Sequence, residues 1–408
     1  MTRARRILML APEPFFEPRG TPFSEYHRIK VLGELGYSVD LVTYPFGRDV
    51  SLPNLRIFRS LRPPFIRGVR VGPSKVKLLL DSLLTITAIR LAVVGRYDAI
   101  HSHEEAGVLG VILAKLLEIP HLYDMHSSLP QQLDNFAYTR SRFVRHLFDR
   151  AERMMVGDSR VVITICQELQ DAVVAAGAGD RSFLIENVMG GDIGEEETSV
   201  GHSKLNVRDR YGIGKEQPLI LYTGTFEEYQ GLGLLLEAAV QLSLVHPDAR
   251  ILIVGGRPEQ VEAARVRMSA GQPASGVVFA GQRPPQEVPY FIEACDILVS
   301  PRISGTNTPL KIYSYLRSGR PIVATNLRTH TQVLARETAL LVEPEAAAFA
   351  AGIQRLIEHP GEGTAIATAA LKLAEERYSR RSYITRTAEA YRLLLGKDAL
   401  PGTLNGDP

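Results

Sequence analysis

The sequence has little of what would mark it as a specialised protein. It contains no tryptophan and only two cysteines, Cys166 and Cys295, and its formal net charge is +2 over 408 residues. Two cysteines in apolar settings argue against a disulfide framework or a cysteine zinc site and fit a reducing compartment. The balance of 47 basic against 45 acidic residues creates no overall field for nucleic acid or anionic lipid, so any such preference must be local.

Long hydrophobic runs are also missing. The apolar stretch Ile7–Ala11 behind the basic N-terminus is too short for a signal peptide, and we predict a β-strand there. The longest apolar region, Val76–Val94, is interrupted by Lys77, Asp81 and Arg90. No stretch reaches the ~20 residues that span a bilayer, and we therefore expect a cytoplasmic protein.

Short β-rich runs alternate with helical segments along nearly the whole chain. The first series predicts strands at 6–10, 39–44, 99–101, 121–123, 161–165 and 182–185, with helices near 23–35 and 107–117. A glycine-rich, acidic interruption at 190–217 predicts a linker. The second series predicts strands at 219–222, 249–254, 277–280, 297–300, 322–324 and 340–342, with helices at 232–245, 258–268, 288–294, 310–317 and 346–358, and then one helical stretch over 365–395.

This alternation predicts an α/β protein with two doubly wound domains, each on a mostly parallel sheet. We place the domains at 1–195 and 218–375, with a linker at 196–217. In such sheets, ligands bind outside the carboxyl ends of the strands. The loops that follow strands are therefore the candidates for chemistry.

The loop after the first strand contains Gly20 and Thr21, followed by Pro22 at the expected helix entry. A glycine there lets the backbone approach a ligand, and the first helical N–H groups would face an anion. The sequence has no GxGxxG, so a dinucleotide site is poorly supported. A helix cap beside an ordinary loop glycine is the alternative.

Two polar loops of the first half follow predicted strands. One contains His101, His103 and Glu104, and the other contains Asp124, His126 and Ser127. The histidines suggest zinc ligands, but no HExxH or comparable pair supports a metal. We expect His101 to be structural. His126 is expected to contact substrate because hydroxyl donors follow it directly.

The second half offers glycine loops and a basic loop. Gly224 with Thr225, and Gly256 with Arg257, follow two strands and are candidate anion cradles. In the stretch SPRISGTNTPLKIYSYLRSGRPIVAT, residues 300–325, a strand is followed by a polar loop. We expect Pro309 to be the first helical residue, Thr306 or Thr308 to cap the helix, and Lys311 to lie in the first turn. With Arg302, these features favour a diphosphate site; solvated surface charges are the alternative.

Taken together, these segments resemble the family 4 glycosyltransferases of the GT-B fold. The resemblance is carried by Gly20-Thr21, YDAIHSH (97–103), IPHLYDMH (119–126), IEN (185–187), LILYTGTFEEYQGLGLLLEA (219–238) and residues 300–325. It implies two Rossmann-like domains facing each other across a cleft, with a C-terminal helix at 376–398 crossing back to the first. It also implies retaining sugar transfer from a nucleotide sugar such as a UDP- or GDP-sugar, with no metal or cofactor. The donor would bind mostly the C-terminal domain and the acceptor the N-terminal domain.

The resemblance assigns roles to residues of this chain. Gly20 matches a glycine near the donor diphosphate, His126 matches an active-site histidine near the sugar, and Lys311 matches a lysine that opens the donor-site helix. We therefore expect His126, Lys311 and Arg302 to be catalytic. The expected donor-binding residues are Gly20, Thr21, Gly224, Thr225, Tyr229, Gln230, Gly256, Arg257, Gly305, Thr306, Asn307, Thr308, Pro309 and Leu310. The expected acceptor and sugar contacts are His103, Glu104, Asp124 and Ser127.

The chain also departs from the family pattern. Members commonly carry Arg and Lys where this chain has Thr225 and Gln230, and two glutamates where it has Thr306 and Ser314. One interpretation is a divergent enzyme whose positive charge moved to Arg302 and Lys311, with hydroxyl contacts from Glu227, Glu228 or Tyr229. The other is an inactive homologue that binds a sugar or nucleotide. A nucleotide-sugar 2-epimerase is a further alternative, with Glu104, Glu105 or Glu227 as acid and base. We expect an active transferase.

A basic, apolar segment indicates where the acceptor comes from. Residues 52–97 carry many Arg and Lys but one acid, Asp81, and a second basic stretch covers 140–153. Such a surface suits peripheral contact with an anionic inner leaflet and a glycan or lipid-linked acceptor. A flexible, solvated insertion is the alternative. Nucleic acid is not expected, since no aromatic-interleaved basic motif is present.

Overall fold

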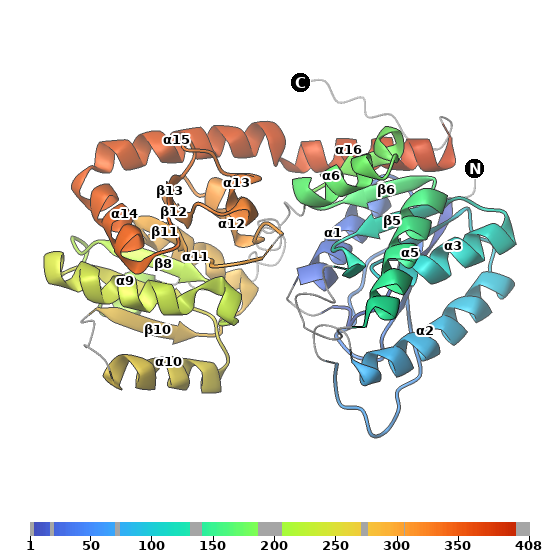
Figure 1. The fold of residues 1–408 in the computed structure, drawn as a ribbon, viewed down its shortest axis with the longest axis horizontal. Coiled ribbons are helices and arrows are strands. Elements are labelled where there is room, and N and C mark those ends of the chain that lie inside the picture. The colour runs from blue at the N-terminus through green and yellow to red at the C-terminus, as the bar shows by residue number, and fades with distance from the viewer. Residues whose placement is uncertain are drawn as a thin grey trace. The chain divides into compact units, whose positions relative to one another are not determined.

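A computed structural model describes residues 4–16, 20–69, 74–130, 141–186, 206–270, 276–305 and 307–396. The chain forms two compact units: Met1–Asn187 together with Tyr383–Pro408, and Val188–Ser382. Each unit is a parallel sheet with helices on both faces (Figure 1). Residues 187–205, which include part of the predicted linker, lie outside the described residues, and the predicted domain boundaries stay predictions.

The first unit is built on a seven-stranded parallel sheet in the order β3-β2-β1-β4-β5-β6-β7. Its strands are β1 (Arg6–Ala11), β2 (Ser38–Thr43), β3 (Leu55–Arg59), β4 (Ala99–His103), β5 (His121–Met125), β6 (Val161–Thr164) and β7 (Ser182–Leu184). Strands covered on both faces become continuous apolar runs, which is why β1 and β6 were readable from sequence. The chain adds strands outward from β1 and then returns to place β4 on its other side. This reversal makes a topological switch point between β1 and β4.

Helices cover both faces of this sheet. They are α1 (Gly20–Glu34), α2 (Lys75–Val94), α3 (Ala106–Leu117), α5 (Arg142–Asp158), α6 (Gln167–Ala175), the short η1 (Gly179–Arg181) and α16 (Arg380–Leu395). Leu80, Leu84 and Ala88 recur every fourth residue of α2 and are buried against the sheet. The alternative that all of 52–97 is a solvated insertion is therefore wrong, because β3 and α2 are integral elements of this unit.

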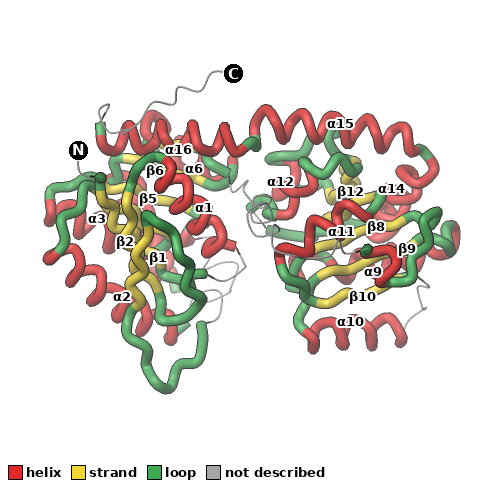
Figure 2. The backbone as a smooth tube through the Cα atoms, turned by 180° about the vertical axis from the view of Figure 1, so that it is seen from behind, coloured by secondary structure: helices red, strands yellow, loops and turns green. Residues whose placement is uncertain are grey.

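The predicted helical stretch over 365–395 is two helices, α15 (Pro360–Arg377) and α16. Ser379 Oγ accepts a hydrogen bond from Ser382 N at 3.2 Å, so a serine cap begins the second helix. α16 packs in the first unit (Figure 2), where Arg5 and Arg160 donate to the carbonyls of Leu395 and Leu393. The two ends of the chain are thus joined in one unit.

The second unit repeats the architecture with six parallel strands in the order β10-β9-β8-β11-β12-β13. They are β8 (Leu219–Thr223), β9 (Arg250–Val254), β10 (Val277–Gly281), β11 (Ile297–Ser300), β12 (Ile322–Thr325) and β13 (Leu340–Val342). The helices are α8 (Val207–Arg210), η2 (Glu228–Gln230), α9 (Leu232–Val245), α10 (Pro258–Ala270), η3 (Pro285–Glu287), α11 (Val288–Ala294), α12 (Lys311–Leu316), α13 (Arg328–Thr331), α14 (Ala346–Glu358) and α15. The switch point lies between β8 and β11.

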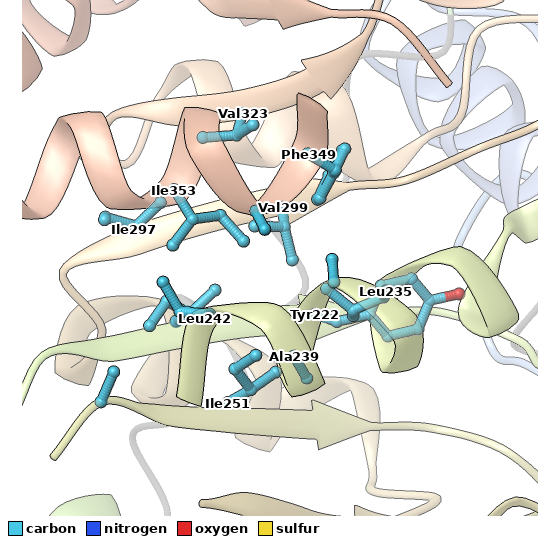
Figure 3. Packing of buried hydrophobic residues seen from close by; sticks show 14 of the residues in the cluster. Tyr222, Leu235, Ala239, Leu242, Ile251, Ile297, Val299, Val323, Phe349 and Ile353 are labelled. Carbon is cyan, nitrogen blue, oxygen red and sulfur yellow. The ribbon is translucent and has the colours of Figure 1, made fainter. Parts of the chain in front are cut away.

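The core of the second unit anchors those strands. Leu235 and Leu242 of α9 and Phe349 and Ile353 of α14 pack over β8, β11 and β12 (Figure 3). Burying each such side chain stabilises the fold by roughly 1.5–3 kcal/mol. The loops at the switch point therefore stand on a rigid base.

One predicted boundary in this unit is wrong. α12 begins at Lys311, two residues after Pro309, and Leu310 occupies its N-cap without a side-chain hydrogen bond. The helix has only six residues, so few peptide dipoles add up at its start. Thr306 lies outside the described residues, and Thr308 Oγ1 makes no hydrogen bond within them. The binding of an anion here cannot rest on a capped helix terminus.

Candidate functional site

The loops at the switch point of the second unit approach each other more closely than any side chain would allow. A Cβ atom at Gly255 would lie 1.8 Å from the carbonyl oxygen of Gly224, and one at Gly231 would lie 1.9 Å from that of Pro301. All three glycines have positive φ, at 125°, 150° and 73° for Gly255, Gly224 and Gly231. Only glycine lets the loops after β8, β9 and β11 pack in this way.

Two amides of these loops are already used. Gly224 N donates to Val254 O at 3.0 Å, and Gly255 N donates to Gly281 O at 2.9 Å. They fasten the loops to the sheet and are not free for a ligand. The first-turn amides of α9, a fourteen-residue helix that starts at Leu232, have no intrahelical partner and carry the helix dipole.

Lys311 ends beside the Gly224 loop. Its Nζ is buried, lies 4.1 Å from the centre of the Tyr222 ring, and has no hydrogen-bond partner within the described residues. A Cβ on Gly224 would lie 3.6 Å from this nitrogen. Burial, reinforced by the charge of Arg302, lowers the pKa of Lys311 to about 7. The alternative of a solvated surface lysine is therefore wrong, because the amine is buried and has no hydrogen-bond partner in the described residues.

Arg302 is also buried, but it holds its own loop together. Its Nη1 donates to Asn307 O at 2.6 Å and to Thr329 Oγ1 at 2.9 Å, and the guanidinium lies 4.9 Å from the centre of the Tyr229 ring. Thr325 Oγ1 in turn donates to Arg302 O. Arg302 braces the loop after β11 and adds positive charge near Lys311. It too is not a solvated surface charge.

A buried histidine that sequence reasoning missed supports the same loop. Ser300 Oγ lies 2.8 Å from His330 Nε2, and His330 Nδ1 lies 2.9 Å from Thr325 O. Burial lowers the pKa of His330 to about 3, so the ring is neutral. Nδ1–H then donates to the carbonyl and Nε2 accepts from the serine hydroxyl. The sequence gives little warning of this role, since His330 lies far along the chain from Ser300.

The remaining donor-side candidates differ in exposure and in hydrogen bonding. Tyr229 is 41% exposed, Gln230 Oε1 is buried without a hydrogen bond in the described part of the chain, and Tyr222 Oη donates to Thr225 O. Arg257 is exposed and pairs with Glu259 at 2.7 Å and Glu227 at 3.7 Å. Its charge is thus largely balanced on the protein. A Cβ at Gly305 would lie 2.9 Å from Arg302 Nη2, so that glycine makes room for the arginine.

The switch point of the first unit holds a buried carboxylate surrounded by nitrogen. Asp124 is in register with His103 on the neighbouring strand. Its oxygens lie 3.6 Å from Arg28 Nε, 3.3 Å from His101 Nε2, 3.2 Å from His126 Nε2 and 3.9 Å from His103 Nδ1. All five side chains are buried. The structure thus brings together Asp124, His103 and His126, three of the candidates named from the sequence, and adds Arg28.

The charges in this cluster follow from burial and neighbours. Burial opposes ionisation of Asp124, but His126 and Arg28 outweigh it and hold the pKa of Asp124 well below its usual value. Burial likewise opposes protonation of His126, yet Asp124, Glu104 and Glu13 raise its pKa. Burial lowers the pKa of His103 well below its usual value. His126 is therefore the ring that carries the proton, and its Nε2 donates to neutral His103 Nδ1 at 3.2 Å.

Further carboxylates lie at the same sheet edge. Ser127 Oγ donates to Glu104 Oε2 at 2.6 Å, and burial raises the pKa of Glu104 to about 7. Glu13 and Glu25, which sequence reasoning missed, are buried with raised pKa values caused mainly by desolvation. The signal for Glu13 was its place directly after the first strand. Gly20 is the first residue of α1 rather than part of a preceding loop, and the side chain of Thr21 is not described.

The ligand atoms of His101, His103 and Asp124 all lie within 4.8 Å of one another, close enough for a metal ion. The guanidinium of Arg28 lies 3.6 Å from the same carboxylate and would repel a cation. His101 Nδ1 is already hydrogen-bonded to Tyr391 Oη at 2.8 Å. We assign no metal to this cluster.

Two family models match the chain. A glycosyl transferase 4-like domain matches residues 28–187, and a glycosyl transferases group 1 domain matches residues 217–359. The phosphatidyl-myo-inositol mannosyltransferase of Mycolicibacterium smegmatis is 23% identical over 394 residues, covering 94% of this chain and 88% of that protein.

Solved structures agree in fold. Sucrose-phosphate synthase from Thermosynechococcus elongatus is 19% identical and aligns with a TM-score of 0.72 over 96% of this chain and 99% of its own. Anabaena HepE in complex with UDP-glucose is 18% identical, with a TM-score of 0.69 over 95% and 99%. The fold is GT-B, and with family matches in both units the chain belongs to the family 4 glycosyltransferases.

Proposed function

We propose that this glycosyltransferase takes its sugar from a nucleoside-diphosphate donor, a UDP- or GDP-sugar, and transfers it to an acceptor hydroxyl with retention of configuration. The observation that carries the proposal is the buried amine of Lys311, which has no acceptor in the described residues and ends at the Gly224 loop. A buried cation without a counter-ion is costly unless a ligand supplies the negative charge. A diphosphate would supply it.

The second unit would stabilise the leaving group. Lys311, once protonated, and the first-turn amides of α9 offer positive charge that is in place before the bond breaks, which is where electrostatic catalysis is most effective. Arg302 keeps the loop after β11 in place through Asn307 and Thr329. Lys311 and Arg302 thereby compensate for Thr225 and Gln230, which are uncharged where family members commonly have basic residues. A UDP-sugar is supported by the UDP-glucose complex of HepE.

The first unit would hold the sugar and the acceptor hydroxyl. His126 carries a proton that Asp124 stabilises, and it would donate a hydrogen bond to the sugar. Glu104, paired with Ser127, would accept from a hydroxyl group. No double-displacement nucleophile is assigned, and the departing phosphate would take the proton of the acceptor. No metal takes part in this scheme.

The acceptor would be a glycan or a lipid-linked molecule reached at a membrane surface. The relative from Mycolicibacterium smegmatis is a phosphatidyl-myo-inositol mannosyltransferase. Within the described residues, no helix is both long enough and apolar enough to cross a bilayer. A protein working at the inner leaflet would then bind it peripherally.

The neighbouring helices α2, α3 and α5 offer a surface for that contact (Figure 1). Leu78, Ile86 and Val93 of α2 are 63%, 60% and 73% exposed along one stripe, and Phe143 of α5 is 76% exposed. Exposed arginines also stand on α2 and α5 or directly after α2, at 90, 96, 142, 145, 150 and 153. Apolar side chains beside cations fit an anionic lipid surface, at about 1 kcal/mol for each well-placed cation.

A donor panel tests the proposed chemistry. The protein is incubated with UDP- and GDP-sugars, with and without glycan and lipid-linked acceptors, while nucleotide release and sugar configuration are followed. Nucleotide release that requires an acceptor and gives a retained anomer is expected. Isomerised donor without transfer would indicate an epimerase, and calorimetric binding without turnover would indicate an inactive homologue; either result would contradict the proposal.

Vesicle sedimentation tests the membrane surface. We expect binding to phosphatidylglycerol vesicles and not to phosphatidylcholine vesicles. Ile86→Glu with Val93→Glu should abolish that binding, whereas Val245→Glu with Val266→Glu, at exposed apolar positions of the second unit, should not. Equal binding by both double variants would remove α2 from the contact.

A further inference from the structure

The C-terminal helix reaches into the Asp124 cluster. Tyr391 Oη lies 2.8 Å from His101 Nδ1, and Thr387 Oγ1 accepts from Arg28 Nη1 at 2.8 Å. Both residues of α16 are completely buried and are one helical turn apart. Arg28 and His101 contact Asp124 but have no proposed contact to substrate. Both are hydrogen-bonded to residues of α16, near the C-terminal end of the chain.

The neighbouring charges indicate where the proton of His101 lies. Asp124 is ionised, and its Oδ2 lies 3.3 Å from His101 Nε2, a contact that is not aligned as a hydrogen bond, so the carboxylate acts on this nitrogen through its charge. Burial lowers the pKa of His101, so the ring is neutral and carries one proton. That proton is best placed on Nε2, facing the carboxylate. Nδ1 then carries no proton and accepts a hydrogen bond from the Tyr391 hydroxyl.

The same carboxylate lies beside the candidate sugar-contacting histidine. Asp124 Oδ1 lies 3.2 Å from His126 Nε2 and acts on it through its charge, because the Nε2–H is hydrogen-bonded to His103 Nδ1. His103 on β4, Glu104 after β4 and Glu13 after β1 also face His126. A tautomer change at His101 would turn a nitrogen lone pair toward Asp124. The repulsion would raise the pKa of that carboxyl group and reduce its stabilisation of the positive charge on His126.

We propose that Tyr391 is a positioning residue for His126: its hydroxyl holds His101 in the tautomer that faces Asp124, and the charge of Asp124 acts on the ring of His126. The inference rests on the proposed function only for its kinetic consequences. It gives the crossing of α16 into the first unit a role beyond packing, because the helix sets the state of a site built from β4 and β5. A helix that only packed would contribute stability and leave the His126 ring unchanged.

The same helix provides a matched control. Tyr383 is buried like Tyr391, but its hydroxyl has no hydrogen-bond partner within the described residues. Its ring lies over Arg28 at 4.7 Å, a contact that phenylalanine keeps. Tyr391→Phe and Tyr383→Phe therefore remove the same atom from the same helix, and only the first removes a hydrogen bond.

Two measurements decide the proposal. In protein labelled with ¹⁵N-histidine, NMR should show His101 protonated on Nε2 in the wild type and in Tyr383→Phe. In Tyr391→Phe that preference should be lost and the titration midpoint of His126 should fall. In steady-state kinetics, Tyr391→Phe should lower kcat about fivefold to tenfold, the effect of about 1 kcal/mol from one buried hydrogen bond. The donor KM should stay unchanged.

A double variant separates positioning from stability. In a His126→Asn background, Tyr391→Phe should cause no further loss of kcat. An equal loss in both backgrounds, or identical NMR spectra for Tyr391→Phe and Tyr383→Phe, would overturn the proposal. Thermal unfolding of each variant shows whether it is folded. If the wild type transfers no sugar, the proposed function fails, while the NMR comparison still decides whether Tyr391 acts on His126.

Discussion

The two switch points have the same strand arrangement but differ in whether their buried ionisable groups have partners of opposite charge. In the first unit, buried charges balance one another: Asp124 lies among Arg28, His101 and His126. In the second unit, no carboxylate within the described residues pairs with the buried nitrogen of Lys311. The charge of Asp124 is therefore balanced by neighbouring side chains, whereas Lys311 has no carboxylate beside it in the described residues.

Under the proposed function, this difference would let two similar sheets take different parts of one reaction. A balanced cluster holds side chains in fixed orientations, which suits contacts to neutral hydroxyl groups. A buried amine without a carboxylate partner, beside glycine loops, suits a diphosphate once it is protonated. The following predictions separate the two sites, beginning with the largest expected effect.

Substitution at the first site should affect turnover. His126→Asn removes the charged donor that we place on the sugar, and kcat should fall about 100-fold. Because the diphosphate is assigned to the second unit, affinity for UDP or GDP should not change. Steady-state kinetics and calorimetry measure the two quantities. A large loss of nucleotide affinity with unchanged kcat would reverse the assignment of the sites.

Substitution at the second site should affect nucleotide affinity. Lys311→Met keeps the aliphatic stem and removes the amine, and the affinity for the preferred nucleoside diphosphate should fall about tenfold, or ~1.4 kcal/mol. Arg257→Met removes an exposed arginine that pairs with Glu227 and Glu259, and should have a much smaller effect. Equal losses for both would show that general positive charge, rather than Lys311, attracts the diphosphate.

The close approach of Gly255 to Gly224 should affect the free energy of unfolding. Gly255→Ala places a Cβ 1.8 Å from the Gly224 carbonyl oxygen, and we expect the free energy of unfolding to drop by more than about 2 kcal/mol. Gly281 also has a positive φ, but a Cβ there meets no atom within 4 Å. Gly281→Ala should cost only the conformational strain, ~1 kcal/mol. Equal losses in urea denaturation would show that strain, and not close approach, selects the glycine.

Nucleotide binding should take up a proton near neutral pH. The pKa of Lys311 is about 7 in the empty site, and a bound diphosphate favours the charged amine, so affinity should fall as pH rises above 7. Between about pH 7 and 10 the unfolded chain binds the additional proton, so the protein without ligand should gain stability as pH rises. Calorimetry at pH 8 in buffers of different ionisation enthalpy measures the uptake. Lys311→Met should abolish it, and uptake that persists in this variant would point to another group.

Removal of divalent metal should have the smallest effect, namely none. After dialysis against EDTA, sugar transfer should proceed at the original rate, because the charge at both sites comes from side chains. A loss of activity restored by Mg²⁺ or Mn²⁺ would contradict this expectation. It would direct attention to His101, His103 and Asp124, whose ligand atoms lie within 4.8 Å of one another.

The elements that were predicted correctly are those whose apolar pattern lies within a single stretch of sequence. Strands such as β8 and helices such as α9 and α14 were predicted nearly to the residue because their apolar patterns are local. β3 and α2 were missed because both contain basic residues, which in α2 obscured the buried stripe at every fourth position. α12 begins later than its proline suggested, since the preceding loop is shaped by Arg302 rather than by a helix cap.

The sequence by itself determined the alternating elements, the two sheets and the loops in which chemistry would lie, because periodicity and strand-end position are properties of neighbouring residues. Tertiary structure alone decided that Lys311 is buried beside Gly224, that Arg28 and His101 surround Asp124, and that Tyr391 reaches them from the end of the chain. Burial and charge balance depend on residues that are hundreds of positions apart. No local pattern records which of them will meet.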